Sequence, residues 1–290
     1  MSRVLVTGAS GLLAATLIPE LVRQGYEVVG TSRNGVGHRC GDLAVAEEAE
    51  ALLNDVRPGL IINLTAATTV ALCERDPWMA YAANALPVEN IVRWIASVSA
   101  RCHLLHLSTD QVYYGAGPHT ESHACPVNVY GFSKYAGELI AARVPSTVIR
   151  TNLFGKSRRA GRESLSDWLV KMLRLHEPAR VFEDILFSPL SMATLAEIVG
   201  MIGRRPIAGT YNVGARGGMS KADFAFGLAN RLGMRVDNLT RVRAAEMLGR
   251  ARRPSDMRMD NTLFEQRYGW TMPTLEEEME RVRSEYEQST

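Results

Sequence analysis

Short runs of apolar residues alternate with longer segments in which apolar residues recur every three or four positions. The runs predict buried β-strands, and the longer segments predict amphipathic helices. Uniformly apolar strands separated by helices are typical of a parallel sheet covered on both faces. The order therefore predicts an α/β fold with a doubly wound parallel sheet. The predicted strands are residues 3–7, 26–31, 60–64, 102–107, 147–150 and 209–213. The first predicted helix ends near residue 23, and the later ones cover residues 77–100, 192–202, 221–232 and 275–286.

Composition narrows the class of protein. With 290 residues, the chain is long enough for one large α/β domain or for a domain with an added lobe. Its content of 46% hydrophobic and 22% charged residues is typical of a soluble globular enzyme. The net charge of +2 is too small to indicate a nucleic-acid partner.

The spacing of the cysteines and the lengths of the apolar runs indicate the compartment in which the protein is expected to reside. The cysteines show no paired spacing, which predicts reduced thiols and a cytoplasmic protein. No apolar run reaches the length that spans a membrane, and the N-terminal segment reads as a strand rather than a signal peptide, so we expect no membrane partner. The cysteines are Cys40, Cys73, Cys102 and Cys125.

One group of metal-ligand residue types occurs in the chain. His119, His123 and Cys125 lie close together in a segment flanked by prolines. Structural metal sites usually require a second pair of ligands, and none follows here. We therefore expect no metal site.

A glycine turn follows the first predicted strand and precedes the first predicted helix. Gly8 permits a tight turn, and Gly11 lets the backbone approach a pyrophosphate whose charge sits at the helix N-terminus. Ala14 is small enough for close packing of the helix on the strand. The alternative is an ordinary strand-to-helix turn, but the position at the start of an α/β chain favours a Rossmann-type dinucleotide site.

The end of the second predicted strand bears on the choice of cofactor. A carboxylate there would bind the ribose 2′-hydroxyl of NAD, and none occurs between Val28 and Gly41. Arg33 stands in this segment, and its guanidinium suits a 2′-phosphate. The sequence therefore favours NADP(H), with NAD(H) as the alternative, although a solvated arginine in a loop fits almost as well. Asp42 and Leu43 are expected to border the adenine.

Small and hydroxyl residues follow the next two strands. Ala66 and Ala67 would let a cofactor lie close to the backbone after residues 60–64. Thr109 and Asp110 follow the strand 102–107, at the edge where open α/β sheets place their sites. A hydroxyl here can bind a substrate carbonyl. A helix cap is the alternative role, but we expect residues 112–115 to be extended rather than helical.

Tyr130 and Lys134 are four residues apart in a segment with helical character. This spacing places both side chains on one face of a helix. A free phenol has a pKa near ~10, and a neighbouring ammonium is expected to lower that pKa. The pair suits proton transfer to a carbonyl oxygen as a hydride arrives on the carbon. The same spacing also occurs by chance on solvated helices.

Five motifs occur along the chain: TGASGLLA at 7–14, NLTAA at 63–67, LSTDQVY at 107–113, PVNVYGFSK at 126–134 and IRTNLFG at 149–155. Together they resemble the extended short-chain dehydrogenase/reductases, and among them the nucleotide-sugar 4-ketoreductases of the dTDP-4-dehydrorhamnose reductase group. The motifs occur in that family's order and spacing over nearly the whole chain, and they are most specific before residue 155.

The resemblance implies roles for individual residues. Thr109, Tyr130 and Lys134 match the catalytic triad, and Lys134 would also hold the nicotinamide ribose. Substrate contacts are expected at Thr109, Asp110, Asn152 and Arg253, the last as a diphosphate contact. The expected cofactor contacts are Gly8, Ser10, Gly11, Leu12, Arg33, Asp42, Leu43, Ala66, Ala67, Asn84, Tyr130 and Lys134.

Three positions depart from the family pattern. Ala14 replaces a glycine of the pyrophosphate loop. Leu153 stands where rhamnose-forming members commonly carry tryptophan, which leaves the sugar open. Gln111 stands where the related 4,6-dehydratases carry glutamate, which argues against water elimination.

The resemblance also implies how the chain is divided and assembled. Residues 1–150 are expected to form the dinucleotide-binding Rossmann domain. Residues 151–290 are expected to form mainly a smaller substrate-binding lobe, with segments near 187–215 returning to the first domain. The helix after Pro77 and the helix that carries Tyr130 are expected to pair across a two-fold axis in a homodimer.

The leading hypothesis is therefore an NADPH-dependent reductase of a 4-keto nucleotide sugar, with Tyr130 as proton donor. One alternative is a nucleotide-sugar epimerase that retains NAD. Another is a non-catalytic dinucleotide-binding regulatory subunit, against which the intact triad argues.

Overall fold

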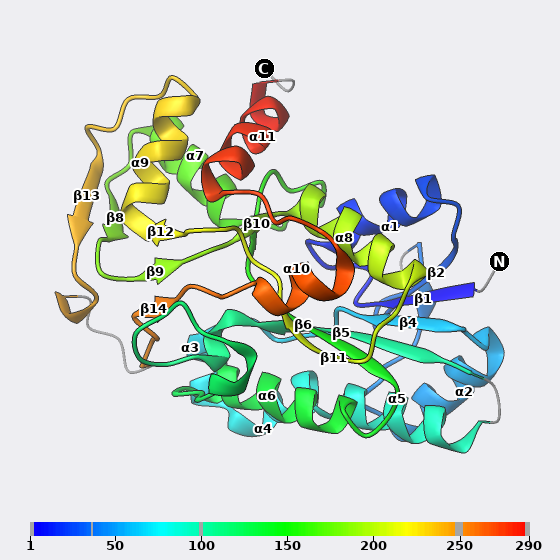
Figure 1. Ribbon diagram of the computed structural model, residues 1–290. Coiled ribbons are helices and arrows are strands. Elements are labelled where there is room, and N and C mark those ends of the chain that lie inside the picture. Colours follow the sequence, from blue (N-terminus) through cyan, green and yellow to red (C-terminus); the bar gives the residue numbers. More distant parts are fainter. Residues whose placement is uncertain (1–2, 36, 99–100, 247–251, 288–290) are drawn as a thin grey trace.

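A seven-stranded parallel sheet forms the centre of the protein (Figure 1). The computed structural model describes residues 3–35, 37–98, 101–246 and 252–287. The strand order is β11-β6-β5-β4-β1-β2-β3, and every neighbouring pair is parallel. The strands are β1 (Arg3–Thr7), β2 (Glu27–Ser32), β3 (Arg39–Cys40), β4 (Leu60–Asn63), β5 (His103–Thr109), β6 (Ser146–Thr151) and β11 (Gly209–Asn212).

Helices cover both faces of this sheet, as the uniformly apolar strands predict. Alternate residues of a strand face opposite sides, so Val4 and Leu105 pack with one layer of helices, whereas Leu5 and Leu104 pack with the other. Figure 1 shows α1 (Ala14–Arg23) and α8 (Met192–Arg204) on one face. The opposite face carries α2 (Ala46–Val56), α5 (Leu86–Ser97) and α6 (Val129–Ala141). The predicted doubly wound α/β fold is confirmed.

The helix predicted over 77–100, for which the sequence favours a kink at Pro87, is wrong in its continuity. The segment forms two helices, α4 (Pro77–Asn84) and α5, which are separated at Ala85. Pro87 occupies the second position of α5, where a missing N–H leaves no intrahelical hydrogen bond unmade. The proline therefore starts a helix instead of bending one.

The later part of the chain forms small sheets and helices beside the carboxyl ends of the central strands (Figure 1). Strand β11 of this part pairs with β6 in the central sheet. The division of the chain into two domains stays a prediction. The remaining elements are α3 (Val70–Arg75), β7 (Leu153–Phe154), α7 (Leu165–Leu175), β8 (Ala179–Phe182), β9 (Leu186–Phe187), β10 (Leu190–Ser191), β12 (Met219–Ser220), α9 (Lys221–Arg231), β13 (Leu239–Val242), β14 (Asp256–Met257), α10 (Thr262–Tyr268), α11 (Leu275–Glu287) and the 3₁₀ turns η1 (Asp110–Val112), η2 (Glu121–His123) and η3 (Ala244–Glu246).

Candidate active site

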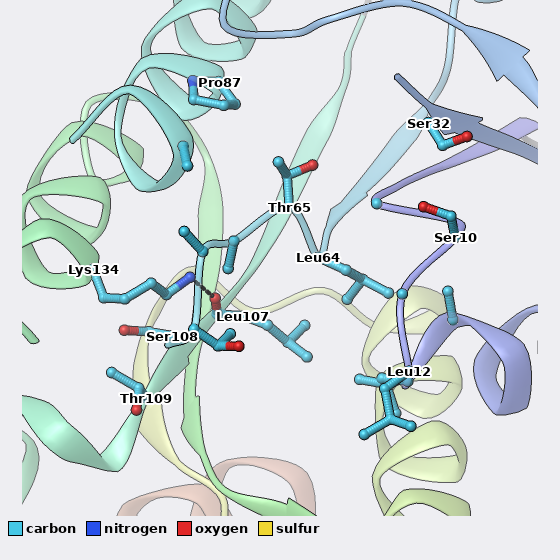
Figure 2. Close-up of a pocket in the computed structure, with 18 of the residues that line it drawn as sticks. Ser10, Leu12, Ser32, Leu64, Thr65, Pro87, Leu107, Ser108, Thr109 and Lys134 are labelled. Atoms are coloured by element: carbon cyan, nitrogen blue, oxygen red, sulfur yellow. Dashed lines mark hydrogen bonds between the residues drawn. The ribbon is translucent and has the colours of Figure 1, made fainter. Parts of the chain in front are cut away.

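A cavity of about 700 Å³ opens at the carboxyl ends of the central strands. Open parallel sheets bind ligands at this edge because the loops that leave the strands diverge there. In Figure 2, Ser10 and Ser32 lie at one end of the cavity, and Lys134, Ser108 and Thr109 lie at the other. Residues predicted from separate motifs thus line one space.

The glycine turn forms one wall of the cavity. Gly8 adopts φ +64°, and a Cβ there would lie 3.0 Å from the Leu64 carbonyl carbon. Gly11 donates its backbone N–H to the Gly8 carbonyl at 2.8 Å, and a Cβ at Gly11 would lie 2.9 Å from that oxygen. Ser10, Leu12 and the first residue of α1 also line the cavity. The glycine turn therefore brings the N-terminus of α1 to the cavity, an arrangement that suits an anion.

The end of β2 forms the far wall, opposite the catalytic candidates. Ser32 and Arg33 line the cavity there, together with Asp42 and Leu43. The Ser32 hydroxyl is buried and has no hydrogen-bond partner in the protein. A free hydroxyl and an arginine follow β2 here, whereas the carboxylate of this wall, Asp42, follows β3; this arrangement fits a phosphate better than a ribose diol. Ser32 gave no signal in the sequence, because a serine in a predicted loop is common.

Ala66 and Ala67 line the cavity after β4, as predicted, but Asn84 does not. The Asn84 side chain is fully buried behind them. Its Oδ1 accepts from the Ala67 N–H at 2.7 Å, and its Nδ2 donates to the Ser133 hydroxyl at 2.8 Å. Asn84 therefore ties the cavity wall to helix α6 rather than lining the site itself.

Thr109 ends β5 and lines the cavity beside Asp110. The expectation that no helix follows Thr109 is wrong. The 3₁₀ turn η1 begins at the next residue, and the Thr109 hydroxyl caps it by accepting from the Gln111 N–H at 3.2 Å. The Thr109 side chain also lowers the pKa of the nearby Tyr130, against the larger effect of burial. Thr109 thus serves as a cap and still faces the candidate proton donor.

Asp110 is a buried carboxyl group in the cavity wall. The Asn152 side chain donates to its Oδ2 at 2.7 Å, and Thr109 donates to its Oδ1 at 3.2 Å. Burial raises the pKa of Asp110 to about 6 despite these donors. The predicted substrate residues Thr109, Asp110 and Asn152 therefore form one hydrogen-bonded group.

Tyr130 and Lys134 project into the cavity from the first two turns of α6. Asn128 caps this helix by accepting from the Gly131 N–H at 2.7 Å. Gly131 allows the helix to lie against η1, because a Cβ there would overlap the Gln111 carbonyl oxygen. The Lys134 ammonium donates to the Leu107 carbonyl at 2.6 Å, as the dashed line in Figure 2 shows.

The expected lowering of the Tyr130 pKa below that of a free phenol is wrong in direction. Burial raises the pKa of Tyr130 well above its ordinary value, and the effect of the Thr109 side chain offsets this only in part. Burial also lowers the pKa of Lys134 to about 8. Removing a charged group from water outweighs the pairwise attraction, and the i,i+4 spacing alone gives no information on burial.

Two basic positions from the sequence behave differently. Arg253 is exposed and does not line the cavity, although its charge contributes to a lowered pKa of Lys221, which burial causes in the main. Arg162 does line it, with Glu163, in the loop between β7 and α7. Ser164 and Asp167 form a capping box that ends this loop at α7.

Within the part of the chain that the structure describes, no cluster of His, Cys, Asp and Glu has the arrangement of a metal site. No helix in that part is both long enough and apolar enough to cross a membrane.

Residues 2–288 match the family model described as the RmlD substrate binding domain. The chain belongs to this family. The dTDP-4-dehydrorhamnose reductase of Sinorhizobium fredii is 30% identical over 298 residues, which cover 97% of this chain and 96% of that protein. The dTDP-4-dehydrorhamnose reductase of Streptomyces griseus is 34% identical and aligns over 73% of this chain and 68% of its own.

Solved structures agree with this assignment. The dTDP-4-dehydrorhamnose reductase of Bacillus anthracis, solved in complex with NADP, superposes with a TM-score of 0.88 at 28% identity and covers 98% of this chain and 99% of its own. The UDP-glucose 4-epimerase of Thermotoga maritima has a TM-score of 0.82 at 18% identity, covers 99% of each chain and shares the fold. The predicted membership of the extended short-chain dehydrogenase/reductases, next to the dTDP-4-dehydrorhamnose reductases, is confirmed.

Proposed function

We propose that this RmlD-family protein uses NADPH to reduce the keto group of a 4-keto nucleotide sugar. The observation that carries the proposal is the convergence of Thr109, Tyr130 and Lys134 on the cavity that the glycine turn also lines. The relatives named as dTDP-4-dehydrorhamnose reductases and the related structure with NADP support the same reaction class.

The residues of the chain divide the chemistry between them. A reduced nicotinamide bound in the cavity would supply the hydride. Tyr130 donates the proton to the substrate oxygen, and Thr109 orients that oxygen through its hydroxyl. The raised pKa of Tyr130 keeps the phenol protonated at neutral pH. The Lys134 ammonium then stabilises the phenolate that proton donation leaves behind.

The glycine turn, Ser32 and Arg33 form the proposed site for the cofactor phosphates, with NAD(H) as the alternative cofactor. The residues that line the cavity extend from this wall to Lys134. For the substrate, we assign Asp110 and Asn152 to the sugar and Arg253 to the diphosphate. We also assign residues 151–290 mainly to substrate binding.

Oxidation of NADPH, followed against a panel of 4-keto nucleotide sugars, tests the proposed reaction. We expect ketone-dependent oxidation with at least one sugar and rapid exchange of the cofactor. Leu153 lines the cavity next to Asn152, so the panel has to vary the sugar as well as the nucleotide. Tightly retained NAD together with epimerisation, or no turnover with any member, would contradict the proposal.

Cofactor choice gives a first prediction. Replacing Arg33 with alanine is expected to weaken NADPH binding more than NADH binding, because NADPH alone carries the 2′-phosphate. Charge-assisted hydrogen bonds are worth about 1.5–3 kcal/mol, so the ratio of the two dissociation constants should change by roughly 10-fold or more. Fluorescence titration of both cofactors measures it.

The matched control for this variant is Arg39→Ala. Arg39 is an exposed arginine on the neighbouring strand β3 that pairs with Asp55 and does not line the cavity. Its removal should leave the ratio unchanged. Equal losses for both cofactors in Arg33→Ala would remove the argument for Arg33.

Assembly gives a second prediction, for a homodimer through α4 and α6. Trp78 on α4 is 69% exposed, and Phe132 on α6 is 63% exposed. Leu139, seven residues after Phe132, lies on the same face of α6 and is also exposed. Sedimentation should give a dimer for the wild type and a monomer for Phe132→Ser/Leu139→Ser. Leu175→Ser, an exposed leucine on α7, should remain dimeric. A monomeric wild type at working concentration would refute this assembly.

The proposal places the enzyme in the cytoplasm. The four cysteines are free thiols, which suits a reducing compartment. Nucleic acid is not among the proposed partners.

A further inference from the structure

Helix α6 carries a second buried charge behind Lys134. Glu138 follows Lys134 by four residues, so both side chains lie on the same face of the helix. Lys134 is 3% exposed and Glu138 is 4% exposed. An isolated charge in such a place is costly, so each group requires a partner or loses its charge.

Two neighbouring strands hold the Glu138 carboxylate. Ser108 on β5 and Arg150 on β6 are partners in the register of the sheet, so their side chains lie side by side beneath α6. Arg150 binds Glu138 through Nη2 at 2.6 Å and Nε at 3.0 Å from Oε2, and the Ser108 hydroxyl donates to Oε1. The carboxylate is therefore fixed in one position at the junction of α6, β5 and β6.

The Lys134 ammonium binds the same strand, β5, one residue before Ser108. It donates to the carbonyl of Leu107, which directly precedes Ser108. A neutral carbonyl satisfies one N–H but does not compensate the charge. Helix α6 is thus tied to two consecutive residues of β5, through the lysine and through the glutamate.

The other groups around Lys134 do not supply the missing negative charge. His106 on β5 is fully buried, and burial together with the charge of Lys134 holds the pKa of this imidazole well below its usual range, which makes it neutral at pH 7. Arg150 on β6 is itself positive. Beside Gly137, which lies between Lys134 and Glu138 in the sequence of α6, helices α4 and α5 contribute Asn84 and Val88, which are uncharged.

Two more carboxylates and a thiol face the same helix from elements packed against it. Asp110 on η1 is hydrogen-bonded to Asn152, and Glu74 on α3 accepts from the Val129 N–H at the start of α6. Cys73 on α3 lies near Tyr130. Among the surrounding charges, Glu138 raises the pKa of Lys134, whereas the larger effect of burial lowers it.

We propose that Glu138 is a positioning residue for Lys134: its carboxylate, fixed by Arg150 and Ser108, supplies the negative charge that keeps the buried ammonium charged at neutral pH. The consequence for catalysis rests on the proposed function, in which the charged lysine stabilises the Tyr130 phenolate. The electrostatic effect of Glu138 on Lys134 does not depend on the proposed function, and it can be measured without a substrate.

The chain has four lysines, which makes a direct measurement practicable: Lys134, Lys156, Lys171 and Lys221. In the full-length protein labelled with ¹³C at the lysine ε-carbon, the resonance that disappears in Lys134→Arg is that of Lys134. Its titration midpoint is then followed with pH. A nearby opposite charge shifts midpoints by up to about 1–3 units, so Glu138→Gln should lower the Lys134 midpoint by about 1 unit.

Two variants serve as controls. Glu138→Asp retains the charge and should keep the midpoint close to that of the wild type. Glu278→Gln removes another buried carboxylate, one that accepts from Ser191 and Thr194 at the start of α8 and does not line the cavity. It should reduce stability without moving the Lys134 midpoint.

If Glu138→Gln does not fold because Arg150 is left unpaired, Glu138→Gln/Arg150→Met removes both partners of the ion pair. Its Lys134 midpoint should lie below that of Arg150→Met alone, because the comparison of these two variants isolates the charge of Glu138. A wild-type midpoint in a folded Glu138→Gln variant, or equal midpoints in Arg150→Met and the double variant, would overturn the proposal, as would an equal shift in Glu278→Gln.

The pH profile of kcat/KM separates this inference from the proposed reaction. If both are right, the alkaline limb moves to lower pH together with the resonance. If the resonance moves but no 4-keto sugar is reduced by the wild type, the role of Glu138 stands and the proposed function fails.

Discussion

Replacing Tyr130 with phenylalanine is expected to lower kcat by at least about 10²-fold, because the variant keeps the ring but lacks the proton that reaches the substrate oxygen. The side chain is buried against Val70 and Cys73, so the ring should remain in place. The lost hydroxyl belongs to the end of the cavity that Thr109 lines, away from Ser10 and Ser32. NADPH affinity should therefore barely change. Steady-state kinetics and fluorescence titration measure the two effects.

Tyr135→Phe is the matched control for this prediction. Tyr135 lies on the same helix but does not line the cavity, and its ring faces Arg150 at 5.9 Å. Its replacement should leave kcat within a few-fold of the wild type. A Tyr130→Phe enzyme that reduces its ketone at nearly the wild-type rate would rule out the proposed mechanism, whatever the substrate.

Lys134→Met is expected to impair turnover and cofactor binding together. The variant keeps most of the packed stem but removes the ammonium that stabilises the phenolate and, by family resemblance, holds the nicotinamide ribose. We expect kcat/KM to fall by about 10²-fold or more. Alanine at the same position should have the same direction of effect, with an added loss of packing.

The pH dependence of the wild type belongs to the same prediction. Burial lowers the pKa of Lys134 to about 8, so the ammonium loses its proton as the pH rises through that value. Activity that requires the charged lysine is complete below this pH and declines above it. Since kcat/KM reports the free enzyme, its alkaline limb should lie near pH 8 and disappear in Lys134→Met.

Lys156→Met is the control, since the Lys156 ammonium donates to the Glu285 carbonyl and does not line the cavity. It should retain both the rate and the limb. A Lys134→Met enzyme with unchanged cofactor affinity and an unchanged alkaline limb would show that Lys134 is a packed helix residue without a role in the reaction.

The sequence by itself determined the fold and the general place of the site. Apolar runs located six strands of the central sheet to within two residues, because continuous burial on both faces leaves few polar positions in a strand. The short strand β3 and the helix α2 were not found, since β3 is exposed and has no apolar run. The break at Ala85 was missed because Pro87 suits both a kink and a helix start.

The sequence also brought most of the site residues to one edge. The positive φ of Gly8 and the i,i+4 spacing of Tyr130 and Lys134 are local properties, so they can be recognised before any packing is known. Parallel strands place their carboxyl ends together, which unites the turn after β1 with Thr109 after β5.

Tertiary structure alone decided the electrostatics of the site and the roles of the residues behind it. Spacing predicted that Lys134 would lower the pKa of Tyr130, yet burial moves that pKa upward and lowers the pKa of Lys134. Asn84 and Arg253 matched motifs but do not line the cavity. Glu138 gained its partners from two strands that are distant in sequence. Local spacing fixes which side chains share a face, whereas desolvation and buried pairing depend on every element packed around them.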